Sequence, residues 1–359
     1  MRKYRNRVLA GFAIGFIIYL ALLLVADARG LTHDLMAKLQ LFPWLLVVPI
    51  ILQKIVSWFF RFLEWHYYLG VIGARDKIGL LDSVLLWVSG FTMVVSPGKA
   101  AEVLKAVVLK TKTGIPVAVS APVVLAERVV DGVAVIVLSF LALLLAGNGI
   151  DLGSYRALIY LSTGLLIFGL VAVQLRPVAY FFLGIIARLP LIGRARDWLT
   201  RFYESSYEIF KLKHLLPATI FGVVAGIGDT IGFLIILSGF GVEVTWLLSL
   251  QAVVIFGLAS AIGALSGVPN GAGITEISVS AMLTIIVAPT NPVMTPGVAA
   301  AAAVLQGFFY KWFRVLVGLA VATIFRRRLF SSDLEAAIAE MEQEHLQQRT
   351  EFSTEVSNV

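Results

Sequence analysis

The chain has no cysteine, four histidines and few charged residues, and each shortage excludes a class of protein or site. Without cysteine there is no disulfide, thiolate metal site or cysteine nucleophile. The histidines, at positions 33, 66, 214 and 345, lack the spacing of metal ligands, so we expect neither a metal nor another cofactor. Charged residues make up 14% of the 359 residues, against about 25% in soluble domains, which excludes a water-soluble fold.

The sequence motifs of common enzymes and ATP-driven pumps are also missing. There is no Gly-x-Ser-x-Gly, no His-Glu-x-x-His and no Walker phosphate loop. We therefore expect neither an enzyme nor primary ATP-driven transport. The basic residues follow one membrane face rather than a groove, so nucleic acid is not an expected partner.

Apolar residues are abundant and predict an all-α polytopic membrane protein. They make up 59% of the chain, and the mean hydropathy is +0.91. The first apolar run, 8–26, follows four basic residues and is longer than the roughly 7–15 residues of a signal-peptide core, which favours an uncleaved anchor. At about 20 residues per crossing, we expect five further full spans, which lie at 43–69, 116–146, 155–175, 215–240 and 297–325.

Two more apolar stretches, 80–110 and 246–288, are interrupted near their middles by proline and glycine. The first contains Pro97-Gly98, and the second contains Pro269-Asn270-Gly271-Ala272-Gly273. A continuous helix tolerates such an interruption poorly, and irregular backbone at membrane depth must be covered by protein or line a polar cavity. We therefore predict two re-entrant helical hairpins.

The distribution of lysine and arginine predicts the orientation. With the N-terminus inside, most basic residues fall in the cytoplasmic segments, which are 2–7, 75–77, 99–112, 176–213 and 326–328. The outside loops hold only Arg29, Lys38 and Arg156. By the positive-inside rule, this asymmetry predicts a multi-pass protein of the inner (cytoplasmic) cell membrane with both termini in the cytoplasm.

We divide the chain into a membrane domain, 1–330, and an acidic cytoplasmic tail, 331–359. Within the first, 176–213 is either an amphipathic linker on the cytoplasmic surface or a plain basic loop. The order span, hairpin, span describes both 43–146 and 215–325, with opposite starting sides, as an inverted-topology repeat predicts. A glutamate follows each break, Glu102 in the first and Glu276 in the second.

Ionisable residues inside the apolar stretches are the candidate functional residues, because each costs roughly 2.5–3.5 kcal/mol to insert. The cations are Arg61, Lys105, Arg128, Lys311 and Arg314, and the acids are Glu64, Glu102, Glu127, Asp131, Asp229 and Glu276. Arg61 and Glu64 are three residues apart and can partly neutralise each other, as can Arg128 and Asp131. Asp229 stands alone, so it is either protonated or paired with a base from another helix. Snorkelling to the interface and a purely structural ion network remain open for these charges.

These motifs together resemble the lysylphosphatidylglycerol synthase transmembrane, or flippase-like, family. The matching pieces, spread over 43–325, are Arg61, Ser96–Lys105, Glu127–Asp131, Pro269–Glu276 and Tyr310–Arg314. The resemblance implies a membrane protein that moves a lipid or lipid-linked sugar between leaflets. No aminoacyl-transferase domain follows the membrane part, so lipid aminoacylation is not expected.

Our hypothesis is a flippase with two facing hairpins around a polar cavity. The five cations, with Pro97, Gly98, Asn270, Gly271 and Gly273 at the half-helix ends, would bind a phosphate-bearing headgroup. The six acids would balance those charges or carry a coupling proton. The expected partner is an anionic phospholipid, an aminoacylated phospholipid or a lipid-linked sugar, and a homo-oligomer is left open. The alternatives are an ion-coupled transporter of a small soluble solute and an intramembrane lipid-modifying enzyme.

Overall fold

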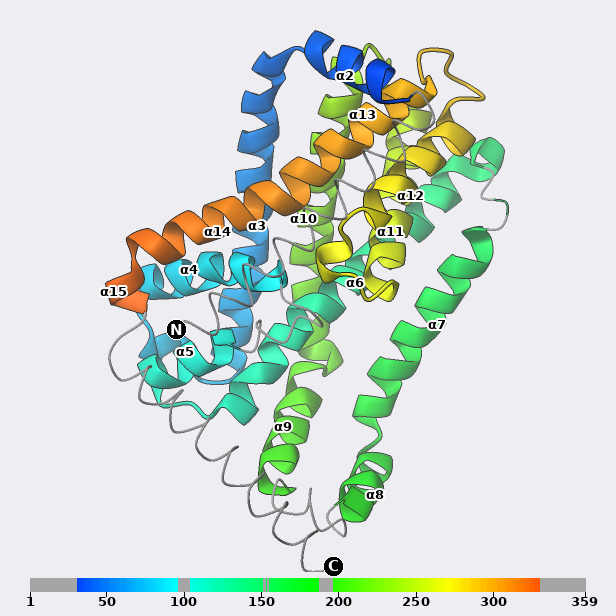
Figure 1. Cartoon of the computed structure of the whole chain (residues 1–359). Helices are drawn as coiled ribbons and strands as arrows, with labels where there is room; N and C mark the ends of the chain where they lie inside the picture. The colour runs from blue at the N-terminus through cyan, green and yellow to red at the C-terminus, as the bar shows by residue number, and fades with distance from the viewer. Residues whose placement is uncertain (1–30, 96–103, 151–152, 154, 187–195, 330–359) are drawn as a thin grey trace, which may run out of the picture.

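The computed structural model describes residues 31–95, 104–150, 153, 155–186 and 196–329, and within these ranges it contains helices and no strand. This confirms the all-α fold class. The expectations for the 8–26 span, for Pro97, Gly98 and Glu102, and for the 331–359 tail lie outside the described residues. Figure 1 shows the helices.

Five of the described helices are long and apolar enough to cross a membrane. They are α3 (Val47–Val71) with the 3-10 turn before it (Trp44–Leu46), α6 (Val117–Ala146), α10 (Leu212–Gly239), α11 (Trp246–Leu265), and α13 (Pro296–Gly307) continued by η9 (Phe308–Trp312) and α14 (Phe313–Ile324). Four of them coincide with predicted full spans to within a few residues. The protein is therefore a multi-pass membrane protein.

A sixth candidate span is bent. It pairs α7 (Tyr155–Gln174) with α8 (Arg176–Ile186), and the two helices meet at 75°. The sequence analysis predicts a span at 155–175 and a separate linker from 176, and it does not predict the bend between them. Pro177 at the second position of α8 fits a new helix start, because its missing N–H and fixed φ are tolerated there. The predicted 176–213 linker accordingly contains two helices, α8 and α9 (Arg196–Ile209).

The stretch predicted as the second hairpin contains two antiparallel arms. The outgoing arm is α11, and the return arm is α12 (Ile274–Met282) extended by the π-helical η8 (Leu283–Val287). Gln251 Nε2 near the start of α11 donates to the carbonyl oxygen of Ile286 near the end of the return arm, at 3.2 Å. At about 30 Å, α11 also has the length of a full crossing, so entry and exit on one membrane side stays a prediction.

The stretch predicted as the first hairpin has the same antiparallel form. Its arms are α4 (Leu80–Ser89), continued by η3 (Gly90–Val95), and α5 (Leu104–Thr113). Lys112 Nζ at the end of α5 lies 3.6 Å from Asp82 Oδ1 at the start of α4. η3 packs against η7 (Pro269–Gly271), so the first arm of the first stretch contacts the broken part of the second.

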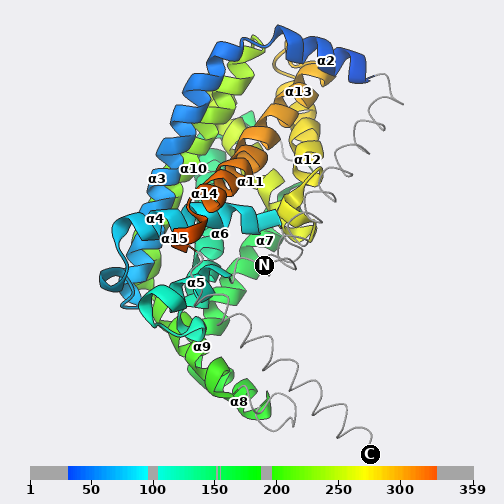
Figure 2. The same ribbon diagram turned by 60° about the vertical axis from the view of Figure 1, so that its left-hand side comes forward.

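Contacts between the two halves are reciprocal. The first arm of each hairpin packs against the last long helix of the other half: α4 against α14, and α11 against α6. The first helices of the two halves, α3 and α10, pack against each other (Figures 1 and 2). An inverted repeat predicts this pattern, although the repeat and the domain boundaries stay predictions.

Among the described residues, the segments predicted to be cytoplasmic lie toward the same end of the molecule (Figure 1). There Tyr67 Oη lies 2.9 Å from His214 Nδ1, and Arg328 Nε lies 2.6 Å from Asp82 Oδ1. α2 (Leu31–Leu41) lies at the other end (Figure 2), and just after it the rings of Phe42 and Phe240 are 5.1 Å apart. Which of the two ends faces the cytoplasm stays a prediction.

Glu208 stabilises the corner between α9 and α10. It accepts hydrogen bonds from Lys211 and Lys213, which lower the pKa of its carboxyl from 4.5 to about 2. Because that pKa is depressed in the folded protein, the stabilisation is complete above about pH 4.5 and is lost as pH falls through about 2. The exposed position keeps the effect small.

We predict that Glu208→Gln is cut by pepsin near this corner several-fold faster than the wild type at pH 4. The ratio of the two rates should fall toward one as pH drops to about 2, because about half of the wild-type carboxylates are then protonated and most of the pH-dependent stabilisation of the corner is lost. A ratio that stays constant between pH 4 and pH 2 would show that the ion pairs do not hold this corner.

Candidate functional site

A cavity of about 750 Å³ lies between the long helices and is lined by charged side chains. The charged residues in its lining are Lys54, Arg61, Arg128, Asp131, Asp229, Lys311 and Arg314. Most belong to the middle turns of α3, α6, α10 and the last long helix. With five cations and two acids, the described lining is suited to an anion.

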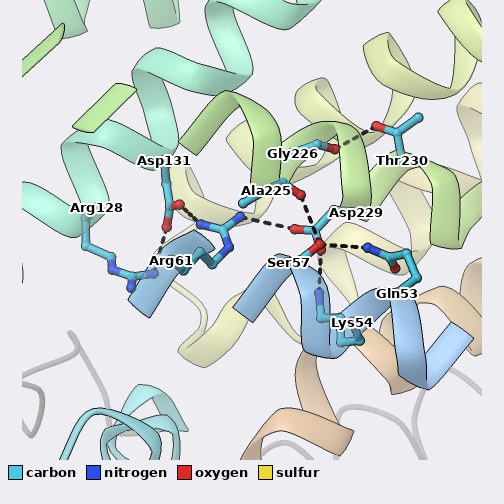
Figure 3. Close-up of polar contacts among 10 residues, drawn as sticks. All are labelled: Gln53, Lys54, Ser57, Arg61, Arg128, Asp131, Ala225, Gly226, Asp229 and Thr230. Carbon is cyan, nitrogen blue, oxygen red and sulfur yellow. Dashed lines mark hydrogen bonds and ion pairs between the residues drawn. The ribbon is translucent and has the colours of Figure 1, made fainter. Parts of the chain in front are cut away.

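Arg61 joins three helices at this cavity (Figure 3). Its Nη2 donates to Asp229 Oδ2 on α10 at 3.1 Å, and its Nη1 forms an ion pair with Asp131 Oδ1 on α6. Arg128 Nη1 contacts the other oxygen of Asp131 at 3.1 Å, which confirms the predicted i,i+3 pair. Arg61 is therefore paired across helices, not with Glu64 on its own helix as the spacing predicted.

Lys54 also binds Asp229. Its Nζ lies 2.8 Å from Asp229 Oδ1 and 3.7 Å from the centre of the Tyr310 ring. Lys54 and Asp229 are both buried, so Asp229 has a base from another helix, the second of the two predicted alternatives. The sequence analysis missed Lys54, although the rule that selected Arg61 would have found it inside the same apolar span.

Small residues on α10 let α3 approach closely enough for these contacts. A Cβ at Gly228 would lie 2.6 Å from Ser57 Oγ, and one at Gly232 would overlap the Gln53 side chain. Ser57 Oγ in turn donates to the carbonyl oxygen of Ala225 at 3.1 Å (Figure 3). The Gly-rich sequence of α10 thereby positions Asp229 against Lys54 and Arg61.

The tip of the second hairpin is tied to the last long helix by Lys311. Its Nζ donates to the carbonyl oxygen of Gly271 at 3.0 Å and to Glu276 at 3.2 Å. Glu276 also caps α12 by accepting from the Gly273 N–H at 2.8 Å. Lys311 lies in the π-helical turn η9, a feature that is frequent at functional sites.

A further buried ion pair ties the first hairpin to α6. Lys105 Nζ donates to Glu127 Oε2 at 2.8 Å, and Trp87 Nε1 donates to Glu127 Oε1 at 2.8 Å. Glu64 is buried in the same region, and its Oε1 has no hydrogen-bond partner in the described part of the chain. These groups line a small recess beside the main cavity, which Arg61, Arg128 and Arg314 also reach.

We predict that Lys105→Met lowers the free energy of unfolding by about 3–5 kcal/mol, because it leaves the buried Glu127 carboxylate without its cation. The double variant Lys105→Met/Glu127→Gln should regain most of that loss. Thermal unfolding in detergent measures both. A double variant as unstable as the single one would show that packing, rather than the ion pair, carries the effect.

The structure brings most of the predicted cations together. Arg61, Arg128, Lys311 and Arg314 line the cavity with Asn270 and Gly271, whereas Lys105 lies beside it and Gly273 serves as the helix cap. Besides Lys54, the sequence analysis missed Gln306 and Tyr310, two more lining residues. Neither is charged, so a search for intramembrane charge could not select them.

Comparison with known proteins identifies one family for most of the chain. The family model described as the lysylphosphatidylglycerol synthase TM region matches residues 8–318. Comparison with curated proteins and with solved structures gives no match. The matched range contains every described residue that lines the cavity.

Proposed function

The chain belongs to the lysylphosphatidylglycerol synthase TM region family, and from that premise we propose that it moves a phosphate-bearing lipid headgroup between leaflets through the cavity. The observation that carries the proposal is the cavity lining, where Lys54, Arg61, Arg128, Lys311 and Arg314 outnumber Asp131 and Asp229. A lipid phosphate is an anion that guanidinium and ammonium groups bind well. The proposed activity is transport and includes no covalent step.

The walls of the cavity suit a lipid whose tails stay in the bilayer. On the α7 side, Ile159, Leu165 and Leu166 contribute apolar surface to the lining. On its other faces α7 exposes Leu161 and Phe168, as expected of a helix in contact with lipid. A headgroup in the cavity would need a polar path, while its acyl chains could pass along α7.

The acids would serve as exchange partners for the phosphate. Asp131 and Asp229 form ion pairs with the guanidinium group of Arg61, and Glu276 forms an ion pair with Lys311. An entering phosphate would compete with these carboxylates for the same N–H groups. One of the acids would also carry a coupling proton.

Displacing Glu276 would free the hairpin tip, so headgroup binding would favour rocking of one half against the other. In the predicted orientation the α2 end faces outside, and the protein resides in the inner cell membrane.

The test is transfer of a fluorescent phosphatidylglycerol between leaflets of proteoliposomes. We expect Arg128→Gln and Asp131→Asn each to lower the rate at least tenfold, because each breaks the ion-pair chain through Arg61. Arg176→Gln removes an arginine whose ion pair with Glu204 is exposed, and it should keep the wild-type rate. Normal transfer by folded Arg128→Gln and Asp131→Asn variants would contradict the proposed function.

A further inference from the structure

Two amide side chains in the cavity lining each have a buried atom without a hydrogen-bond partner among the described residues. Gln306 on α13 is 1% exposed, and the unpaired atom is its Oε1; at the hairpin tip it is Nδ2 of Asn270. Both residues line the main cavity with the cations. Buried polar atoms are nearly always hydrogen-bonded in folded proteins. Two unpaired polar atoms on residues that line the same cavity therefore indicate that a bound ligand supplies their missing hydrogen bonds.

The backbone of Asn270 supports the same conclusion. With φ of 56°, it is the one non-glycine residue among those described that has a positive φ. Glycine adopts this conformation without steric cost, and asparagine does so less readily. An asparagine rather than a glycine at this position therefore indicates that the side chain has a role of its own. Residues held in such conformations cluster at ligand-binding sites.

The two free atoms are complementary to a hydroxyl group. Nδ2 of Asn270 can only donate, and Oε1 of Gln306 can only accept; a hydroxyl can do both in return. An ammonium group has no acceptor and would leave Asn270 unsatisfied. Three serines, Ser139, Ser162 and Ser260, add further hydroxyl groups to the lining.

We propose that Asn270 and Gln306 are specificity-determining residues that bind the hydroxyl groups of a lipid phosphate whose headgroup is an uncharged polyol, such as glycerol or a sugar-like ring. The proposal rests on the proposed function, because it assigns the substrate class of the same cavity. Cations hold the phosphate, and the two amides distinguish what is attached to it.

The experiment measures binding of short-chain lipids to the full-length protein in detergent by calorimetry. The probes are dihexanoyl phosphatidylglycerol, phosphatidylmethanol, phosphatidylinositol and phosphatidylethanolamine. Phosphatidylmethanol has the phosphate charge of phosphatidylglycerol without its hydroxyls, so this pair isolates hydroxyl recognition. We expect phosphatidylglycerol to bind about tenfold more tightly than phosphatidylmethanol, and phosphatidylethanolamine to bind more weakly than either. Tighter binding of phosphatidylinositol than of phosphatidylglycerol would assign a ring polyol, and the reverse would assign glycerol.

Three variants test the residues. Asn270→Gly, which suits the backbone conformation, and Gln306→Leu should each reduce the tenfold preference to about twofold. Gln251→Leu is the matched control, because it removes a buried amide that bonds to Ile286 and does not line the cavity; it should keep the preference. Equal binding of phosphatidylglycerol and phosphatidylmethanol by the wild type, or an unchanged preference in Asn270→Gly and Gln306→Leu, would overturn the inference. Selective binding without leaflet transfer would contradict the proposed function alone, and transfer without selectivity would contradict the inference alone.

Discussion

Replacing Arg61 with lysine is expected to lower the rate of lipid transfer at least tenfold, although the positive charge is kept. The guanidinium group contacts Asp131 on α6 and Asp229 on α10 through two different nitrogens, which one ammonium group cannot reproduce. Each lost hydrogen bond to a charged group costs about 1.5–3 kcal/mol. Arg61→Met should abolish transfer and lower the free energy of unfolding by about 1.5–3 kcal/mol, because Asp131 and Asp229 lose their shared hydrogen-bond donor but keep Arg128 and Lys54 as cations.

The measurements are leaflet transfer in proteoliposomes and thermal unfolding in detergent. Arg176→Lys, at an exposed ion pair with Glu204, is the matched substitution outside the cavity and should change neither quantity appreciably. If Arg61→Lys transferred lipid at the wild-type rate, the arrangement of two carboxylates around one guanidinium group would have no part in transport.

Removing Lys311 is the second change expected to have a large effect. Lys311→Met should lower transfer about a hundredfold, because the cavity loses a cation and the carbonyl of Gly271 and the carboxylate of Glu276 both lose their donor. The same change should destabilise the protein by about 3–5 kcal/mol, since Glu276 stays buried without a cation. The hairpin tip should then exchange its amide hydrogens faster over residues 266–276.

A double variant separates the structural effect from the functional one. Glu276→Gln keeps the cap on α12, because a glutamine oxygen can accept the Gly273 N–H. Lys311→Met/Glu276→Gln should therefore regain most of the lost stability and little of the transfer rate. Recovery of both together would show that Lys311 acts only as a structural partner of Glu276.

The sequence predicts the long helices well because lipid imposes a length and an apolar composition on each of them. α6 and α10 begin and end within a few residues of the predicted spans. The bend between α7 and α8 is not predicted, because both helices are apolar and a hydropathy pattern does not show where the helix axis changes direction. Pro177 was the available signal.

The pairing of charges is harder to predict than their presence. Spacing along one helix predicted Arg128 with Asp131 correctly, since both residues lie on the same face of α6. The same reasoning failed for Arg61, whose partners lie 70 and 168 positions away along the chain. Contacts of that kind depend on how helices pack, and for α3 and α10 that packing depends on Gly228 and Gly232.

The central claim, that a lipid headgroup passes through the cavity, is tested most directly by blocking the cavity. The chain has no cysteine, so an introduced thiol is the only one that reacts. Ser162→Cys places a thiol in the lining on α7, and Ser238→Cys places one on an exposed part of α10 outside that lining. After reaction with benzyl methanethiosulfonate, Ser162→Cys proteoliposomes should transfer phosphatidylglycerol no faster than protein-free vesicles, and Ser238→Cys proteoliposomes should keep the wild-type rate. Undiminished transfer by fully modified Ser162→Cys would contradict passage of the headgroup through this cavity.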